Sequence, residues 1–186
     1  MHRKYILSRG YSPKKIQKVW GQLYGTGFYG AYKYRLIIPI IFNGKLISYQ
    51  GRDITGKQEL RYKNCPKPQE VKHIKDVVYG YDQAYGGDSV VVCEGVMDVW
   101  RLGPGSVATF GIDYTRKQVM LIGRSFKNRF IFYDSADRQA LVQANKLAES
   151  LSIYPGKIEV IKCTESDDPG ELSDSSAKKI MKELLG

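Results

Sequence analysis

From residue 88 onward the chain alternates short apolar runs with amphipathic segments, and this alternation constrains the fold more than any other feature. The pattern predicts strands at about 89–93, 106–110, 129–133 and 157–162. Helices are predicted at about 96–102, from Thr115, at about 137–151, and over the last segment, which contains Ala177, Ile180, Met181 and Leu184. Four β-α units in succession are typical of a mostly parallel sheet with helices on both faces. We therefore expect an α/β domain over residues 88–186.

Residues 1–87 show a different pattern, which predicts a small α+β subdomain. Ser12 and Pro13 are typical of the first positions of a helix, whose buried face would contain Ile16, Val19 and Trp20. Two apolar runs, 36–42 and 46–50, flank Asn43-Gly44, which is a strong signal for a two-residue hairpin turn. The glycine-rich segment 21–30 is expected to be an irregular loop. Gly86-Gly87-Asp88 is the expected boundary between the subdomains.

The net charge of +10 is confined to the first half of the chain. Residues 1–87 contain 16 Lys and Arg against 5 Asp and Glu, whereas residues 88–186 contain 13 against 14. Such asymmetry suggests a polyanionic partner. The chain also has 14 tyrosines, and basic groups interleaved with aromatic rings suit a single-stranded nucleic acid. A solvated basic surface without a specific partner is the alternative explanation for the charge.

Acidic residues follow three of the predicted strands. Glu94 ends the first strand and Asp98 lies one helical turn later, Asp134 and Asp137 follow the third strand, and Asp167, Asp168 and Glu171 follow the last strand after a short loop. Strand carboxyl ends share one edge of an open α/β sheet and line its ligand crevice. Carboxylates gathered there repel one another unless a cation lies among them, and oxygen ligands suit Mg²⁺ or Mn²⁺. The sequence thus predicts a divalent-metal site for phosphoryl transfer.

Neither a membrane segment nor a zinc site is expected. No apolar run approaches the roughly 20 residues that span a bilayer, and the first residues lack the apolar core of a signal peptide. The three cysteines, Cys65, Cys93 and Cys163, are far apart and have no zinc-ligand spacing. We expect a cytoplasmic protein without a membrane segment or a zinc site.

Several segments resemble, in order, the motifs of bacterial and phage DNA primases. The similar segments are Ser8-Arg9-Gly10-Tyr11-Ser12, the hairpin from Arg35 to the Gly51-Arg52 pair, Arg61-Tyr62-Lys63-Asn64-Cys65-Pro66, 78–84, Glu94-Gly95-Val96-Met97-Asp98 and 107–111. The resemblance spans roughly residues 8–172 and identifies the second half as similar to a TOPRIM domain, the metal-binding fold of these primases. Three motifs depart from the family pattern. Asp-x-Asp is here Asp134-Ser135-Ala136-Asp137, and Asp-Pro-Asp is here Asp168-Pro169-Gly170. In the Lys-Tyr-x-Asn-Ser-Pro motif, Arg61 replaces Lys and Cys65 replaces Ser.

The resemblance implies a DNA primase core that copies single-stranded DNA into a short RNA primer from ribonucleoside triphosphates. It implies a template and nucleotide-contacting subdomain over 1–87, a metal-binding catalytic domain over 88–186, and a replicative helicase as a further candidate partner. Glu94 and Asp98 would be catalytic, and the metal ligands would be Glu94, Asp134, Asp137 and Asp168. The residues that would contact nucleotide or nucleic acid are Arg9, Arg52, Arg61, Tyr62, Lys63 and Asn64.

Each of these residues also has a simpler interpretation. Glu94 could be an acid favoured near a helix N-terminus, Asp98 could be a solvent-facing helix residue, and Asp137 could be the N-cap of the following helix. Tyr62 could pack in the core while the arginines are solvated. Two other functions remain open for the same fold: a metal-dependent TOPRIM nuclease and a non-catalytic TOPRIM subunit that only binds nucleic acid.

Overall fold

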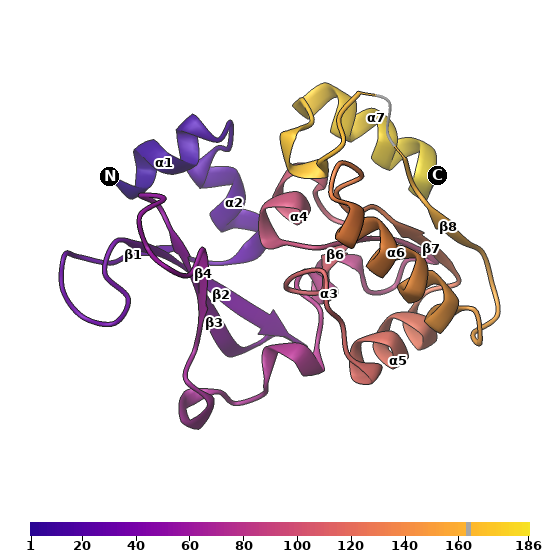
Figure 1. Cartoon of the computed structure of the whole chain (residues 1–186), viewed down its shortest axis with the longest axis horizontal. Helices are drawn as coiled ribbons and strands as arrows, with labels where there is room; N and C mark the ends of the chain where they lie inside the picture. The colour runs from indigo at the N-terminus through magenta and orange to yellow at the C-terminus, as the bar shows by residue number, and fades with distance from the viewer. Residues whose placement is uncertain (163–164) are drawn as a thin grey trace. The chain divides into compact units, whose positions relative to one another are not determined.

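The structure, a computed structural model, describes residues 1–162 and 165–186, so Cys163 lies outside the described residues. The chain divides into two compact units, Met1–Ile74 and Lys75–Gly186 (Figure 1). Each unit has its own sheet of four strands. The expected combination of a small α+β subdomain and a parallel α/β domain is confirmed.

The first unit is built around an antiparallel sheet in the order β1-β2-β3-β4. Its elements are α1 (His2–Ser8), α2 (Pro13–Trp20), β1 (Tyr24–Gly25), β2 (Arg35–Phe42), β3 (Lys45–Asp53), β4 (Tyr62–Asn64) and the 3₁₀ turn η1 (Lys67–Gln69), and a second 3₁₀ turn, η2 (Ile74–Asp76), begins at its last residue. Ile38 and Ile40 of β2 are fully buried. The long β2–β3 hairpin therefore supplies the centre of this unit.

Two of the predicted local signals in this unit are confirmed. Ser12 is the N-cap of α2, its side chain accepts a hydrogen bond from the amide of Lys15, and Pro13 is the first helical residue. Ile16 and Trp20 of this helix are buried, whereas Val19 is only partly buried. The β2–β3 turn has φ values of 52° at Asn43 and 70° at Gly44, the left-handed conformation that a two-residue hairpin turn needs at both positions.

The second unit contains a parallel sheet, as predicted, and its strand order is β6-β5-β7-β8. Its elements are α3 (Tyr81–Ala84), β5 (Ser89–Cys93), α4 (Val96–Leu102), β6 (Ser106–Ala108), α5 (Arg116–Ser125), β7 (Asn128–Ile131), α6 (Arg138–Leu151), β8 (Ile158–Val160), the 3₁₀ turn η3 (Pro169–Glu171) and α7 (Asp174–Leu185). The two central strands, β5 and β7, are almost wholly buried, which explains why they read as continuous apolar runs in the sequence.

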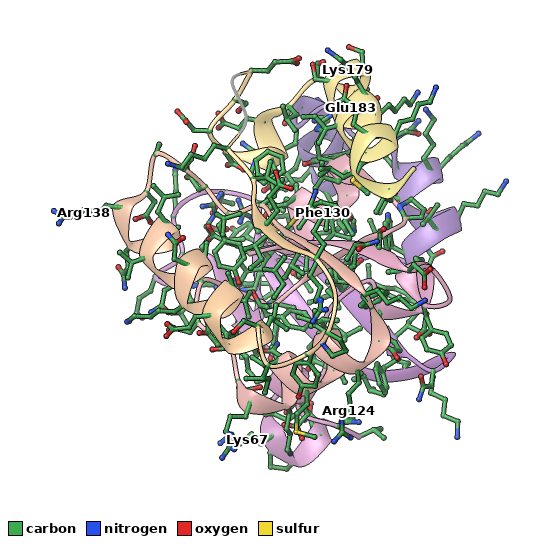
Figure 2. All side chains as sticks on the ribbon, turned by 90° about the vertical axis from the view of Figure 1, so that its right-hand side faces the viewer. Lys67, Arg124, Phe130, Arg138, Lys179 and Glu183 are labelled. Carbon is green, nitrogen blue, oxygen red and sulfur yellow. The ribbon has the colours of Figure 1, made fainter. Side chains whose placement is uncertain are left out.

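Helices cover both faces of this sheet. Alternate side chains of the central strands, Val91 and Cys93 from β5 and Phe130 from β7, pack in one cluster with Ala177 and Met181 of α7. Helices α5 and α6 contact each other on the opposite side, and α6 also contacts β7 and β8. Figures 1 and 2 show the sheet between α7, which carries Lys179 and Glu183, and α6, which begins at Arg138. This arrangement leaves the carboxyl edge of the sheet to the loops.

Residues 75–87, which the sequence analysis grouped with the basic subdomain, are joined to the second unit by hydrogen bonds. Tyr79 and Ala108 exchange both backbone hydrogen bonds, at 2.9 and 3.0 Å. The hydroxyl of Tyr79 also accepts a 2.8 Å hydrogen bond from the indole of Trp100. Gly86-Gly87-Asp88 thus forms a turn before β5 inside this unit, and the two units divide after Ile74. Over the residues that the structure describes, no helix has the length and apolar character needed to cross a bilayer.

Candidate active site at the carboxyl edge of the parallel sheet

The connections of the parallel sheet run in opposite directions from its centre. The chain passes from β5 to β6 on one side, and then continues through β7 to β8 on the other side of β5. In open α/β sheets, ligands bind outside the strand carboxyl ends where the order reverses in this way. Glu94 directly follows β5, and Asp134 follows the extended end of β7, so both residues lie at this point. The backbone amide of Asp134 donates a 3.0 Å hydrogen bond to Oε1 of Glu94.

The carboxyl group of Glu94 lies in an acidic and partly buried environment. Its pKa is raised above the ordinary value, first by burial and then by the carboxylates of Asp134, Asp137 and Asp168, while the hydrogen bond from the Asp134 amide opposes the shift. These four predicted metal ligands are thus close enough to interact electrostatically.

Asp98 and Asp168 meet at Gly170. The carboxylate of Asp98 accepts a 2.8 Å hydrogen bond from the amide of Gly95, and Asp168 accepts one of 2.7 Å from the amide of Gly170. A β-carbon at position 170 would lie 2.9 Å from Oδ1 of Asp98 and 3.1 Å from Oδ1 of Asp168. Gly170, which stands where the Asp-Pro-Asp motif of primases has its second acid, therefore allows the two carboxylates to approach its backbone.

Cys93, at the end of β5, lies near the carboxylates of Asp98, Glu94 and Asp168. Burial raises the pKa of its thiol well above the ordinary value, and the charges of Asp98, Glu94 and Asp168 raise it further. The thiol is fully buried and belongs to the core cluster between the sheet and α7. Cys93 therefore stays protonated and packs beneath the acidic group, in agreement with its interpretation as a core residue.

The two acids that follow β7 are held by their own loop. Oδ1 of Asp134 accepts a 2.9 Å hydrogen bond from the amide of Ala136. Asp137 is exposed and is the N-cap of α6, with its carboxylate accepting hydrogen bonds from the amides of Gln139 and Ala140. The capping interpretation of Asp137 is therefore confirmed, and an N-cap carboxylate keeps a second oxygen for another ligand.

A short contact joins the second acidic loop to the third. Ser135 donates a 3.0 Å hydrogen bond from its amide to the carbonyl of Asp167, and its hydroxyl donates one of 2.5 Å to Oδ1 of the same residue. Ser135 therefore ties the loop after β7 to the loop that carries Asp168.

Sequence reasoning did not identify Thr109 and Tyr133 as residues of this site. The hydroxyl of Thr109, after β6, lies 2.8 Å from the hydroxyl of Tyr133, next to Asp134, and 2.8 Å from the carbonyl of Gly111. The amides of Thr109 and Gly111 donate to the carbonyls of Cys93 and Glu94, at 3.1 and 2.7 Å. Both side chains are buried, so the ends of β5, β6 and β7 are fastened by one hydrogen-bonded network. In the sequence, Thr109 appeared only within a predicted strand and the primase-like segment 107–111, and Tyr133 only as the last residue of a predicted strand.

Lys75 supports this network from outside the sheet. Its ammonium group donates to the carbonyls of Thr109, Phe110 and Asp113, at 3.0, 3.2 and 2.7 Å. Phe110 has a φ of 63°, an unusual value for a residue with a side chain. Burial lowers the pKa of Lys75, and the charge of Asp113 opposes this effect. The loop after β6 is therefore held in a strained turn by three charge-assisted hydrogen bonds.

The acids at this edge suit a hard divalent cation in their chemistry, because all of them offer carboxylate oxygens. Within residues 1–162 and 165–186, however, no group of three or more His, Cys, Asp or Glu side chains is arranged so that it could hold a metal ion. Each of the four aspartates, Asp98, Asp134, Asp137 and Asp168, instead accepts a backbone hydrogen bond from its own loop. The ligand set Glu94, Asp134, Asp137 and Asp168 stays a prediction.

The predicted nucleotide-contacting residues of the first unit lie on both faces of its sheet. The β3–β4 register places Arg52 opposite Tyr62 and Gln50 opposite Asn64. The guanidinium of Arg52 lies 4.7 Å from the centre of the Tyr62 ring and donates a 3.0 Å hydrogen bond to the hydroxyl of Tyr5. Asn64 accepts a 2.8 Å hydrogen bond from Gln50. Arg52 and Tyr62 therefore form a packed pair.

Three further predicted contact residues lie apart from this pair. Lys63 points to the opposite face of the sheet, where its ammonium lies 5.3 Å from the centre of the Tyr32 ring. Arg61 is exposed just before β4, and Arg9 lies at the C-terminal end of α1. The six residues do not share one surface of the sheet, because neighbouring residues of a strand point to opposite faces. Their contact with nucleotide or nucleic acid stays a prediction.

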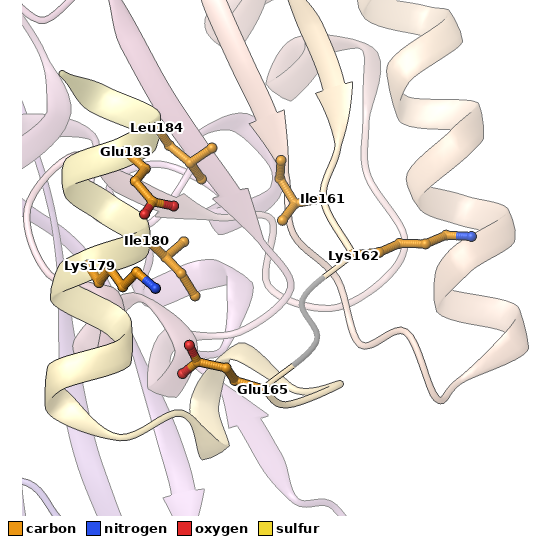
Figure 3. Close-up of a pocket in the computed structure, with 7 residues that line it drawn as sticks. All are labelled: Ile161, Lys162, Glu165, Lys179, Ile180, Glu183 and Leu184. Carbon is orange, nitrogen blue, oxygen red and sulfur yellow. The ribbon is translucent and has the colours of Figure 1, made fainter.

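The second unit also has a hollow of about 220 Å³ away from the acidic edge, between β8 and α7 (Figure 3). Its lining combines apolar side chains with two lysines and two glutamates, and Figure 3 shows Lys162 pointing away from α7. None of the predicted catalytic or metal-binding residues lines it. It gives no support for a small-molecule site connected with the acids.

Comparisons with known proteins find similar sequences and similar structures. No protein-family model matches the chain. It is 29% identical over 168 residues to a DNA primase of Synechocystis, covering 83% of this chain and 26% of the relative. It is 28% identical over 169 residues to a DNA primase of Legionella pneumophila, covering 84% and 29%. The chain thus spans about a quarter of the length of these relatives.

Among solved structures, the E. coli primase catalytic core matches with a TM-score of 0.77 and 22% identity, over 99% of this chain and 72% of that chain. A primase catalytic domain bound to single-stranded DNA matches with a TM-score of 0.73 and 22% identity, over 99% and 71%. The chain has the fold of a DNA primase catalytic core. The resemblance to primases inferred from the sequence motifs is confirmed, and the primase-core fold extends over both units.

Proposed function

We propose that this chain is the catalytic core of a DNA primase, which joins ribonucleoside triphosphates into a short RNA primer on a single-stranded DNA template. The observation that carries the proposal is the direct contact of Glu94 with the Asp134 amide at the point where the strand order reverses, in a chain with the fold of a primase core. The two curated relatives named DNA primase support it independently.

The proposed reaction is nucleotidyl transfer. The 3′-hydroxyl of one nucleotide attacks the α-phosphorus of a ribonucleoside triphosphate, a new P–O bond forms, and the bond to pyrophosphate breaks. The hydroxyl proton must leave during the attack, and we assign its acceptance to Glu94. Its place at the end of β5, with one oxygen held by the Asp134 amide, leaves the other oxygen for this proton. Asp98, held against Gly95 on the first turn of α4, would fix the position of the Glu94 backbone.

The acids would hold Mg²⁺ or Mn²⁺ through Glu94, Asp134, Asp137 and Asp168, and such an ion supplies charge neutralisation for the triphosphate and the departing pyrophosphate. The repulsion that raises the pKa of Glu94 supports a cation among these groups, because a positive charge would relieve it. Asp134, Asp137 and Asp168 would exchange part of their contacts to backbone amides for contacts to the ion.

The first unit is assigned to template and nucleotide contact. Met1–Ile74 contains fifteen Lys and Arg residues and three Asp and Glu residues, an imbalance that favours a polyanion. One of the similar primase catalytic domains was solved with single-stranded DNA, which supports the same class of ligand here. Arg9, Arg52, Arg61, Tyr62, Lys63 and Asn64 are the proposed contacts, with a replicative helicase as a candidate further partner.

Primer synthesis can be tested directly. The purified chain is incubated with labelled ribonucleoside triphosphates, single-stranded DNA and Mg²⁺ or Mn²⁺, and the products are separated on a denaturing gel. We expect template-dependent dinucleotides and longer products that disappear when the template is omitted. The chain is tested up to high concentration, because template recruitment is weak in an isolated core. Absence of any dinucleotide under all these conditions would overturn the proposal.

A non-catalytic nucleic-acid-binding subunit is the second candidate. One observation favours it: the aspartates of the edge are directed to their own loops, and the described residues contain no arrangement of three metal ligands. Calorimetric titration with Mn²⁺ separates the candidates. Binding that Asp134→Ala weakens supports a working metal site, whereas identical titrations for the two proteins favour the binding subunit. Cleavage of labelled DNA or RNA without synthesis would instead indicate a nuclease.

A further inference from the structure

The loop between β1 and β2, residues 26–34, presents aromatic rings to solvent. The side chain of Tyr29 is 90% exposed and that of Phe28 is 62% exposed, and Tyr24, just before the loop, is 60% exposed. The loop is drawn at the left of Figure 1, at the end of β1. Large aromatic side chains exposed next to one another are a feature of binding surfaces, because their burial against a partner is favourable.

The base of this loop is well ordered. Thr26 donates from its amide to the carbonyl of Arg35 at 3.0 Å, and Tyr34 donates to the carbonyl of Gly27 at 3.0 Å. The rings of Phe28 and Tyr34 lie edge to face, with their centres 5.6 Å apart. The tip with Tyr29 is therefore presented from a base closed by hydrogen bonds, and the Phe28 ring beside it is held against Tyr34.

Basic residues outnumber acids around the loop. Residues 24–34 contain Lys33 and no acid, and Lys33 is exposed. The amide of Ile54 donates a 3.2 Å hydrogen bond to the carbonyl of Tyr34, which brings the segment after β3 beside the base of the loop. That segment carries the exposed cations Lys57 and Arg61 and one exposed acid, Glu59. Aromatic faces with surrounding cations and few acids are the combination that single-stranded nucleic acids require.

We propose that loop 26–34 is a stacking platform for unpaired bases of single-stranded nucleic acid, with Tyr29 as the principal stacking residue and Phe28 beside it. The inference rests on the proposed function and extends it, since it names the element of the first unit that binds the template. Lys33 contacts the backbone phosphate next to the stacked base. The ring stacks on any base, so the platform holds the strand without reading its sequence.

The binding of a fluorescent oligothymidylate, followed by anisotropy at several salt concentrations, tests the proposal. Tyr29→Ala is expected to weaken binding about tenfold, as loss of one stacked base does, while Tyr29→Trp retains the affinity. Tyr85→Ala is the matched control, because this tyrosine is 68% exposed but belongs to the other unit. It is expected to bind like the unmodified chain.

Salt dependence separates stacking from charge. Lys33→Ala is expected to reduce the slope of log affinity against log salt by about one unit, whereas Tyr29→Ala leaves the slope unchanged. Equal affinities of Tyr29→Ala and the unmodified chain, or no binding of the oligonucleotide at low salt, overturn the inference. A chain that makes no primers but loses DNA affinity through Tyr29→Ala would contradict the proposed function and support this platform.

Discussion

The amide of Asp134 donates a 3.0 Å hydrogen bond to Oε1 of Glu94, so the residues that end the two central strands of the parallel sheet are in direct contact. The contact fixes one oxygen of Glu94 and leaves the other available for a ligand or a proton. It also brings two carboxylates together in a partly buried place, where burial and then the neighbouring carboxylates raise the pKa of Glu94. Repulsion between carboxylates lowers the stability of the fold, so a catalytic role for these acids explains why they lie together.

Glu94→Gln tests the role of this carboxyl group as a proton acceptor. The amide side chain has nearly the same shape and keeps an oxygen for the Asp134 amide, but it cannot accept a proton in the reaction. We expect primer synthesis to fall by about 100-fold or more, the usual contribution of a positioned base. The initial rate of dinucleotide formation is the measurement.

The fold of this variant should be intact. Removing a charge from a group of repelling carboxylates leaves the thermal unfolding midpoint unchanged or raises it, which circular dichroism can follow. Glu171→Gln is the matched control, since Glu171 is an exposed acid that directly follows the Asp168 loop. Its activity should equal that of the unmodified chain. Retention of a third or more of the activity by Glu94→Gln would exclude Glu94 as the base.

The strands of the parallel sheet could be predicted from sequence because β5 and β7 are buried on both faces and read as continuous apolar runs. Helix α1 could not, because Ile6 is its only buried residue and its N-cap, Met1, provides no side-chain hydrogen bond. The short strand β4 lacked a signal for the same reason: Tyr62 and Lys63 are only partly buried and Asn64 is exposed.

The candidate site was predictable only where it is local in sequence. Glu94 and Asp134 each follow an apolar strand, and strand ends of one parallel sheet meet at one edge. The approach of Asp98 to Gly170 depends on the packing of η3 against α4, which no local pattern encodes. The Thr109 network likewise depends on the adjacency of β5, β6 and β7, so its members were visible only as single polar residues near apolar strands.

The pair Thr109 and Tyr133 is expected to hold the strand ends as a unit. Thr109→Val keeps the shape of the side chain but leaves the carbonyl of Gly111 without its 2.8 Å donor and the buried hydroxyl of Tyr133 without its partner. We expect a loss of about 2 kcal/mol in the free energy of unfolding, measured by urea titration. Primer synthesis should fall more than nucleotide binding, because the acids are misplaced while the first unit is unchanged.

Tyr133→Phe supplies the second arm of a double-mutant cycle. If the two hydroxyls act through each other, the double variant is less destabilised than the sum of the single variants by about 1 kcal/mol. Strict additivity of the two effects would show that each hydroxyl acts independently, and would contradict a shared network across the three strand ends.

Gly170→Ala tests the meeting point of Asp98 and Asp168. The added methyl group would lie 2.9 and 3.1 Å from carboxylate oxygens of these residues, so at least one of them must move. We expect the affinity for Mn²⁺ to fall about tenfold, as it does when the support of a metal ligand is removed. Calorimetric titration of the metal alone is the measurement.

Gly27→Ala is the matched control for this change. A β-carbon at Gly27 would meet no atom within 4 Å, and the residue lies in the other unit. Its Mn²⁺ titration should be identical to that of the unmodified chain. If Gly170→Ala also binds Mn²⁺ normally, the ion does not use Asp98 or Asp168 in the positions that the structure gives them.

Acid sensitivity of the first unit is expected to come from His2. The Nε2 atom of His2 is buried without a hydrogen-bond partner, and a β-carbon at Gly25 would lie only 2.5 Å from Nδ1, so the ring packs closely against the Gly25 backbone. Burial lowers the pKa of His2 below its ordinary value of 6.5, the N-terminal ammonium lowers it further, and a hydrogen bond with the Arg35 backbone opposes both effects.

In the window between the lowered pKa of folded His2 and 6.5, the unfolded chain binds more protons at this residue than the folded chain, so stability rises with pH across the window. The contribution is fully present above pH 6.5 and is lost as the pH falls through the pKa of the folded state.

We expect the thermal unfolding midpoint to decrease on acidification below pH 6.5, and His2→Gln to make this decrease smaller. His73→Gln, at a histidine whose side chain is 41% exposed, should keep the full decrease. Both variants are compared with any affinity tag at the C-terminus, because the N-terminal ammonium contributes to the shift. If His2→Gln leaves the acid response unchanged, the response comes from other groups. That result would contradict a neutral, partly buried imidazole at position 2.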